Sequence, residues 1–206
     1  MVNRILSKER IDAAYVTEVF INNTDVFNFL PKKDVDVDLL AILAIVNSRL
    51  CATYFKTSNV NLDRDAFPKL NVNNLLSLPL PDNFFIGSQA LLIGKTEKII
   101  RLTTELNQLQ SQFLTVLQSK VALAKPSGKL QEWYGLEFKE FVKELEKAKV
   151  KLSLAETGEW LPYFEEQKRK AVALKTEIEK TDREIDRMVY GLYELTEEEV
   201  RIVEGK

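Results

Sequence analysis

The stretch SQALLIGKTEKIIRLTTELNQLQSQFLTVLQSKVAL, residues 88–123, decides the fold of the second half of the chain. Apolar residues recur in it every seven positions, in two rows offset by three. The first row is Leu92, Ile99, Leu106 and Phe113, and the second is Leu102, Leu109, Val116 and Leu123. A repeat of this kind predicts a long helix that buries one face against a partner helix. The run Lys125-Pro126-Ser127-Gly128 predicts its end.

A second pair of apolar rows lies near the C-terminus. These rows are Phe164, Ala171, Ile178, Ile185 and Leu192, and then Leu174, Met188 and Leu195. Two helices of about 30 residues would each be about 45–50 Å long and would most simply pair as an antiparallel hairpin. The rows show that each helix buries a face, which plain structural packing explains, and partner docking along the hairpin stays open.

The connections between these helices carry their own signals. Residues 130–152 predict a further helix inserted between the two long ones. Ser153 with Glu156, and Thr196 with Glu199, have the spacing of capping boxes. Gly158 and Pro162 predict a break or kink before the second long helix.

The first 86 residues have a different pattern. Two runs, AAYVTEVFI (13–21) and DVFNFL (25–30), predict strands separated by a turn at Asn22-Asn23-Thr24. LLAILAIVNSRLCATYFK (39–56) predicts one buried helix that begins near Asp38, whose carboxylate can cap the first turn. AFPKLNVNNLLSLPLP (66–81) predicts short extended pieces.

The predicted fold class is therefore α+β. A small mixed α/β head, residues 1–86, would be followed by a long antiparallel helical hairpin, coiled-coil-like and with an inserted helix, over residues 87–206.

Composition points to a cytoplasmic globular protein. The chain has 206 residues, of which 45% are hydrophobic and 29% charged. Its longest apolar run, Leu39 to Val46, is far shorter than the roughly 20 residues of a membrane span, and the N-terminus has no signal-peptide core. The single cysteine, Cys51, cannot form an internal disulfide and fits a reducing compartment. We expect no membrane association.

The residue types that most enzymes use are missing. The chain has no histidine and one cysteine, and its seven glycines form no phosphate-binding motif. We therefore expect no catalytic residue, no metal site and no cofactor in this chain. Asp34, Asp36 and Asp38, or Asp63 and Asp65, could hold a divalent metal in a histidine-free hydrolase, but a solvated loop and a helix cap explain them better.

Polar residues in the predicted loops of the head suit DNA recognition. Asparagine can read adenine, arginine can read guanine, and lysine contacts phosphate. The candidates are Lys8, Arg10, Asn22, Asn23, Lys32, Lys33, Lys56, Asn59, Asn61, Arg64 and Lys69. The net charge of −2 argues weakly against an indiscriminate nucleic-acid binder and leaves a specific one open.

The order of several motifs resembles a known family. FINNTDVFNFLPK (20–32), LLAILAIVNSRLCATYFK (39–56) and FPKLNVNNLLSLPLP (67–81) occur in the order found in the C-terminal specificity domain of TaqI-like type IIG restriction-modification methyltransferases. The tail EIEKTDREIDRMVYGLYELTEEEVRIVEG (177–205) resembles the end of such enzymes. Specificity subunits of type I systems show a similar proline pair that leads into a long helix.

The resemblance implies a division of labour. A methyltransferase domain binds S-adenosylmethionine and flips the target adenine through an (N/D)PP(Y/F) motif, which this chain lacks. The chain would be the non-catalytic specificity part, with double-stranded DNA and a methyltransferase domain or subunit as partners. The parent enzyme would be an adenine methyltransferase, with or without endonuclease activity. The alternative is a coiled-coil adaptor that binds a protein and no DNA.

Overall fold

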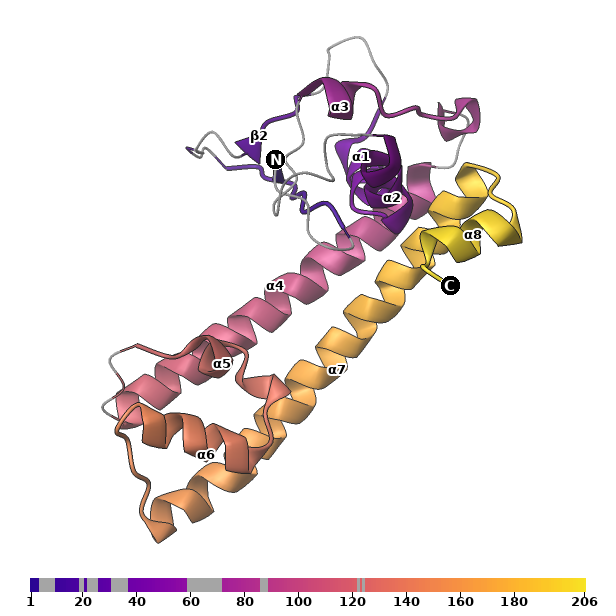
Figure 1. Ribbon diagram of the computed structural model, residues 1–206. Coiled ribbons are helices and arrows are strands. Elements are labelled where there is room, and N and C mark those ends of the chain that lie inside the picture. The colour runs from indigo at the N-terminus through magenta and orange to yellow at the C-terminus, as the bar shows by residue number, and fades with distance from the viewer. Residues whose placement is uncertain are drawn as a thin grey trace. The chain divides into compact units, whose positions relative to one another are not determined.

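The computed structural model describes residues 1–3, 10–18, 21, 26–30, 37–58, 72–85, 89–121, 123 and 125–206. The chain divides into two compact units. Unit 1 comprises Met1–Lys98 together with Thr181–Lys206, and unit 2 comprises Ile99–Lys180. Two long helices, α4 (Gln89–Lys120) and α7 (Leu154–Leu192), each contribute to both units (Figure 1).

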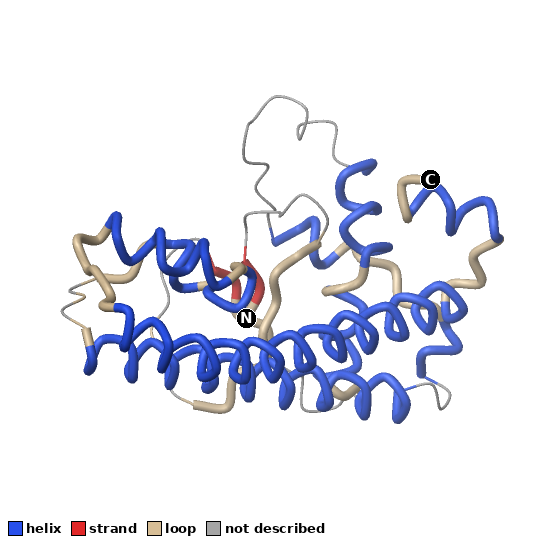
Figure 2. Tube along the Cα trace, turned by 90° about the horizontal axis from the view of Figure 1, so that it is seen from below, coloured by secondary structure: helices blue, strands red, loops and turns tan. Residues whose placement is uncertain are grey.

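The predicted α+β class is wrong, because the part of the chain that the structure describes is predominantly helical (Figure 2). Strand structure there is limited to β1 (Val2–Asn3) and β2 (Val26–Phe27). They pair antiparallel, with Val2 opposite Phe27 and Asn3 opposite Val26. A two-residue ladder forms no layer, so the described residues of the first 86 form no mixed α/β head.

The strand predicted over residues 13–21 is not found in its described part, where only Ala13 makes a bridge contact. Its backbone partners explain the difference. The N–H of Ala14 donates to the carbonyl of Met1 over 2.9 Å, and Ala13 bonds to the side chain of Asn47 in both directions. Single partners of this kind satisfy an extended backbone without building a ladder.

The buried helix predicted over residues 39–56 is two helices, α1 (Leu39–Val46) and α2 (Arg49–Ser58), bent by 61°. The predicted cap is confirmed, since Asp38 Oδ1 accepts from the N–H of Leu40 over 2.7 Å. The bend follows from Ser48, whose hydroxyl donates to the carbonyl of Ile45 and accepts from the N–H of Cys51. A serine at this position starts a new helix rather than continuing the old one.

The extended pieces predicted over residues 66–81 are wrong for α3 (Val72–Leu76), which is helical, whereas residues 78–81 belong to neither helix nor strand. The 3₁₀ turn η2 (Asp82–Phe85) follows them. Tertiary packing overrides the local preference of this segment, because Leu75 is buried in the core of unit 1. The buried members of that core are Ile11, Val46, Cys51, Ala52, Phe55 and Leu75.

The C-terminal segment completes unit 1. The side-chain amide of Asn83 donates to the carbonyl of Leu192 over 3.0 Å, and the Tyr193 hydroxyl donates to the carbonyl of Pro79 over 2.7 Å. The last helix, α8 (Glu197–Val203), packs against α2 and begins with the predicted Thr196–Glu199 capping box. Unit 1 therefore depends on residues from both ends of the chain.

Unit 2 is built around an aromatic core. Between its parts of α4 and α7 lie α5 (Gly128–Gln131), the 3₁₀ turn η3 (Trp133–Gly135) and α6 (Phe138–Lys147), so the predicted inserted helix is confirmed within narrower bounds. The ring of Phe113 stacks on Trp133 with centroids 3.8 Å apart. Phe113, Trp133, Phe141 and Phe164 are all fully buried.

The two predicted long helices are present as α4 and α7, with two differences from their patterns. On α4 the buried row passes from Phe113 to Leu117, while Val116 is exposed, because a straight helix has 3.6 residues per turn and drifts from a seven-residue repeat. On α7 the predicted break is wrong, since the helix runs through Gly158 and Pro162. Burial of Trp160 in the core offsets the cost of the proline.

Within the described ranges, no single helix is long and apolar enough to cross a membrane, although α1 and α2 pass the same test when they are taken as one bent pair.

Candidate functional site

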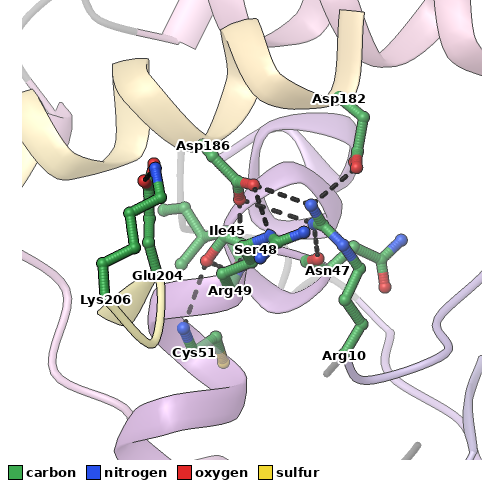
Figure 3. A network of polar contacts seen from close by, with 10 residues as sticks. All are labelled: Arg10, Ile45, Asn47, Ser48, Arg49, Cys51, Asp182, Asp186, Glu204 and Lys206. Carbon is green, nitrogen blue, oxygen red and sulfur yellow. Dashed lines mark hydrogen bonds and ion pairs between the residues drawn. The ribbon is translucent and has the colours of Figure 1, made fainter. Parts of the chain in front are cut away.

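A polar cluster lies in unit 1 where α1 meets α2 (Figure 3). We call it the Arg10 cluster, and it consists of Arg10, Asn47, Ser48, Arg49, Asp182 and Asp186. The guanidinium of Arg10 reaches two carboxylates of α7, with Nη2 at 2.6 Å from Asp182 Oδ2 and 2.7 Å from Asp186 Oδ2. Its Nη1 donates to the carbonyl of Asn47 over 2.7 Å. One side chain thus joins the N-terminal segment, the α1–α2 bend and α7.

Asp186 is the most buried charge of the cluster, with 4% of its surface exposed. Its Oδ1 accepts from the N–H of Arg49, the first residue of α2, over 3.0 Å. The Arg49 Nε lies 3.6 Å from Oδ2. A carboxylate here interacts favourably with the unpaired N–H groups and positive dipole end of a helix. The burial of Asp186 is therefore compensated by two arginines and a helix N-terminus.

Asn47 holds the N-terminal segment in place. Its Oδ1 accepts from the N–H of Ala13 over 2.9 Å, and its Nδ2 donates to the carbonyl of the same residue over 3.0 Å. A side-chain amide that bonds both polar groups of one residue replaces a strand neighbour for that residue. The segment after Arg10 is thereby anchored to the bend.

Burial controls the titration of the cluster and its surroundings. It raises the pKa of Asp182 despite the opposing attraction of Arg10, and Asp186 raises that pKa further. Burial also raises the pKa of the Cys51 thiol to about 12 and, with the charge of Asp186, that of the Tyr190 hydroxyl to about 12. Cys51 is therefore a neutral thiol at physiological pH and a poor nucleophile.

The Arg10 cluster is suited to positioning and not to chemistry. Its carboxylates accept from guanidinium and backbone N–H groups, as a structural ion network does. Among the residues that the structure describes, no group of three His, Cys, Asp or Glu side chains could hold a metal ion. Asp38, which the sequence placed in a candidate metal cluster, caps α1 instead, and Asp34, Asp36, Asp63 and Asp65 lie outside the described residues.

Two of the predicted DNA-binding residues lie in the described part of the chain. Arg10 is turned into the cluster, and Lys56 is exposed in the last turn of α2. The others lie outside the described residues: Lys8, Asn22, Asn23, Lys32, Lys33, Asn59, Asn61, Arg64 and Lys69. Their contact with DNA stays a prediction. Lys56 lies close in sequence to residues 59–71, which connect α2 to α3 and contain four of the predicted DNA-binding residues.

An apolar groove of about 640 Å³ lies elsewhere in unit 1. Residues of α1 and α3 line it, among them Leu43 and Leu76, together with the segment that contains Tyr15. Leu30 at its edge is 86% exposed and Leu76 is 70% exposed. The volume lies in the range of small-ligand and peptide sites.

Sequence reasoning missed the roles of Asn47, Ser48, Asp182 and Asp186. Two of these residues are the NS of the run LLAILAIVNSRLCATYFK, and the other two are the first and last residues of the DREID of the tail. Both runs resemble the same family, so their order along the chain is the signal that the sequence offers. Nothing in either run shows that they meet, because the residues are more than 130 positions apart.

Two family models match different parts of the chain. Residues 87–189, half of the chain, match a domain of unknown function (DUF8810). The chain belongs to the DUF8810 family. Residues 1–80 match the TaqI-like C-terminal specificity domain, which confirms the resemblance drawn from the motifs. No curated protein and no solved structure matches the chain. The DUF8810 match covers all of unit 2 and parts of α4 and α7 that belong to unit 1.

Proposed function

We propose that this chain is the DNA target-recognition part of a restriction-modification adenine methyltransferase. The observation that carries the proposal is the match of residues 1–80 to the TaqI-like C-terminal specificity domain. The tail, residues 177–205, lies outside this match, and its resemblance to the end of such enzymes also supports the proposal. A specificity domain selects the sequence on which a separate catalytic domain acts, and this division assigns no catalytic residue to the chain.

Unit 1 supplies a rigid frame for such a reader. The Arg10 cluster holds the N-terminal segment, the α1–α2 bend and α7 together through bonds of 2.6–3.0 Å. Base-reading side chains must be held in place because a good bidentate contact is directional. Segments that follow a well-packed scaffold commonly carry recognition residues, and in the sequence residues 59–71 connect α2 to α3 of unit 1.

The predicted contacts divide by chemistry. Asn59, Asn61 and Arg64 are suited to base edges, whereas Lys56 and Lys69 are suited to phosphates. The methyltransferase domain or subunit would bind S-adenosylmethionine, flip the adenine and supply further phosphate contacts. The long helices α4 and α7 would hold the reader and the catalytic part in register.

The test is selection from a randomised duplex DNA library, with the full chain alone and with the methyltransferase domain or subunit added. An enriched sequence, bound more tightly once the methyltransferase is present, is the expected result. Arg64→Ala should weaken binding to that sequence by about 5- to 150-fold and relax one position of it. Lys69→Ala should weaken binding about equally for all sequences.

Lys206→Ala is the control, because it also removes one exposed positive charge from unit 1 and leaves residues 59–71 untouched. It should bind like the wild type. No enrichment at low salt, with or without the methyltransferase, would overturn the proposal. The adaptor interpretation would then come first, with the apolar groove as the surface for a protein partner.

A further inference from the structure

A row of lysines lies on the solvent side of α6 in unit 2. Lys139 and Lys143 are four residues apart and therefore project from nearly the same side of the helix, about 6 Å apart along its axis. The opposite side carries Phe141 and Leu145, both fully buried in the aromatic core. Lys149 and Lys151 follow the end of the helix in the sequence and are also exposed. We call these four residues the α6 lysine face.

Two of the three glutamates in residues 138–151 already make contacts within the fold. Residues 138–151 carry five lysines and three glutamates. Glu140 accepts from the backbone N–H of Glu137 over 3.0 Å in the capping box of α6. Glu144 is buried, accepts from Ser127, and pairs with Lys147 at 2.6 Å, an interaction that lowers the pKa of Glu144. Only Glu146 of the three lies exposed without such a role.

The four lysines of the face make no ion pair with any residue in the described ranges, in contrast to Lys147 and to Lys168 and Lys170 of α7. Ammonium groups without such pairs have their charges available to a partner. Repulsion within the set weakens when the partner is a polyanion.

Lys149 occupies a backbone position where glycine is the usual residue. Its φ is +65°, and the N–H of Val150 donates to the carbonyl of Leu145 over 3.0 Å, which closes the end of α6. A left-handed residue at this point is most often glycine or asparagine, because a Cβ is strained there. A lysine is present despite that strain, and it adds a positive charge six residues after Lys143.

We infer that the α6 lysine face binds the phosphate backbone of double-stranded DNA, so that the DUF8810 region adds a sequence-independent contact to the reader in unit 1. The inference rests on the proposed function for its partner. Lysine ammonium groups are point charges suited to phosphate oxygens and carry no base specificity. Each phosphate that is neutralised releases counterions, so this contact has a measurable salt dependence.

The test measures DNA affinity of the full chain, across a salt series, on the selected duplex and on a scrambled one. Lys139→Gln with Lys143→Gln should weaken binding to both duplexes by about tenfold at low salt and reduce the slope of log K against log salt by about 2. The matched control, Lys168→Gln with Lys170→Gln, removes the same charge from unit 2 but from lysines already paired with glutamates. It should stay within about twofold of the wild type.

Lys149→Gly separates charge from folding. It removes one charge of the face and relieves the strained backbone, so the melting temperature should be unchanged or higher while DNA affinity falls. A fall in affinity together with a fall in melting temperature would count against a direct contact.

The outcomes distinguish this inference from the proposed function. Sequence-preferring binding that none of these lysine variants alters would overturn the inference, leave the proposed function standing and assign the face to an acidic protein surface. Binding that depends on the lysines but shows no sequence preference would support the inference and overturn the proposed function. No DNA binding by the wild type at low salt would overturn both.

Discussion

Arg10 Nη2 donates to Asp186 Oδ2 over 2.7 Å, although the two residues are 176 positions apart in the chain. This contact closes unit 1, because Arg10 belongs to the N-terminal segment and Asp186 to α7. Asp186 has 4% of its surface exposed, so its charge depends on protein groups and not on water. The stability of the head is therefore tied to a residue far outside the segment that matches the specificity domain.

Arg10→Ala should destabilise unit 1 by about 2–4 kcal/mol, because it leaves a buried carboxylate with fewer partners. Urea denaturation, followed by circular dichroism, measures the loss. Lys206→Ala breaks the exposed pair with Glu204 and should cost under about 1 kcal/mol. Equal losses in the two variants would mean that the Arg10 contact carries no special weight.

Asp182→Asn and Asp186→Asn should have opposite consequences. Burial raises the pKa of Asp182 in the folded protein above its unfolded-state value. The protonated carboxyl therefore contributes to the free energy of unfolding below the unfolded-state pKa, and this contribution is lost as pH rises through the folded-state pKa. Asp182→Asn removes that loss and should leave unfolding free energy at pH 7 unchanged or higher. Asp186→Asn weakens the bonds to Arg10 and Arg49 and should lower it. Denaturation between pH 4 and pH 7 compares them, and a strong loss in Asp182→Asn would contradict this ranking.

Tyr193→Phe should destabilise unit 1 by about 1 kcal/mol, because it removes the hydrogen bond from the Tyr193 hydroxyl to the carbonyl of Pro79. Burial raises the pKa of this hydroxyl, which keeps it protonated as a donor across the physiological range. Deletion of residues 193–206 should lower the stability of unit 1 further, because it also removes the contacts between α8 and α2. Tyr15→Phe is the control, because Tyr15 is half exposed. Equal melting temperatures for the two phenylalanine variants would argue against a contribution of the C-terminal segment to the stability of unit 1.

Gly158→Ala should stabilise unit 2 by about 1 kcal/mol, because alanine favours a helix and the added Cβ meets no atom within 4 Å. Pro162→Ala restores an N–H that can bond within the helix and should stabilise it by about 1–2 kcal/mol after the unfolded-state effect of proline is subtracted. Guanidinium denaturation tests both variants. A destabilised Gly158→Ala would show that α7 is not helical at that point.

The long helices and their caps could be predicted because their signals are local. Apolar residues at helical spacing lie on one face whatever their partner, and a serine or threonine three residues before a glutamate caps a helix from within one turn. Asp38, Ser153 and Thr196 all act as their neighbours in sequence predict. The family resemblance of the first 80 residues was also readable, because it depends on the order of motifs along the chain.

The failed predictions concern segments whose structure depends on distant partners. Residues 13–18 have strand-like composition, but Ala13 and Ala14 bond to Asn47 and Met1, and the Leu39–Lys56 run bends where Ser48 caps a second helix. Whether an apolar, β-branched segment forms a strand depends on a neighbouring strand, which its own residues do not specify. Gly158 and Pro162 fail to break α7 because the burial of Trp160 and Phe164 favours the continuous helix.

The sequence by itself determined the helical character of the second half, the positions of its caps and the family of its first 80 residues, since each is carried by neighbouring residues or by their order. Only the tertiary structure decided that residues 181–206 complete the head and that Arg10 pairs with Asp186. Only the structure also showed that four lysines of unit 2 are left without ion-pair partners in the described ranges. These features depend on which surfaces meet after folding. The free-energy cost of burying Asp186, for example, is offset by groups more than 130 residues away in the sequence.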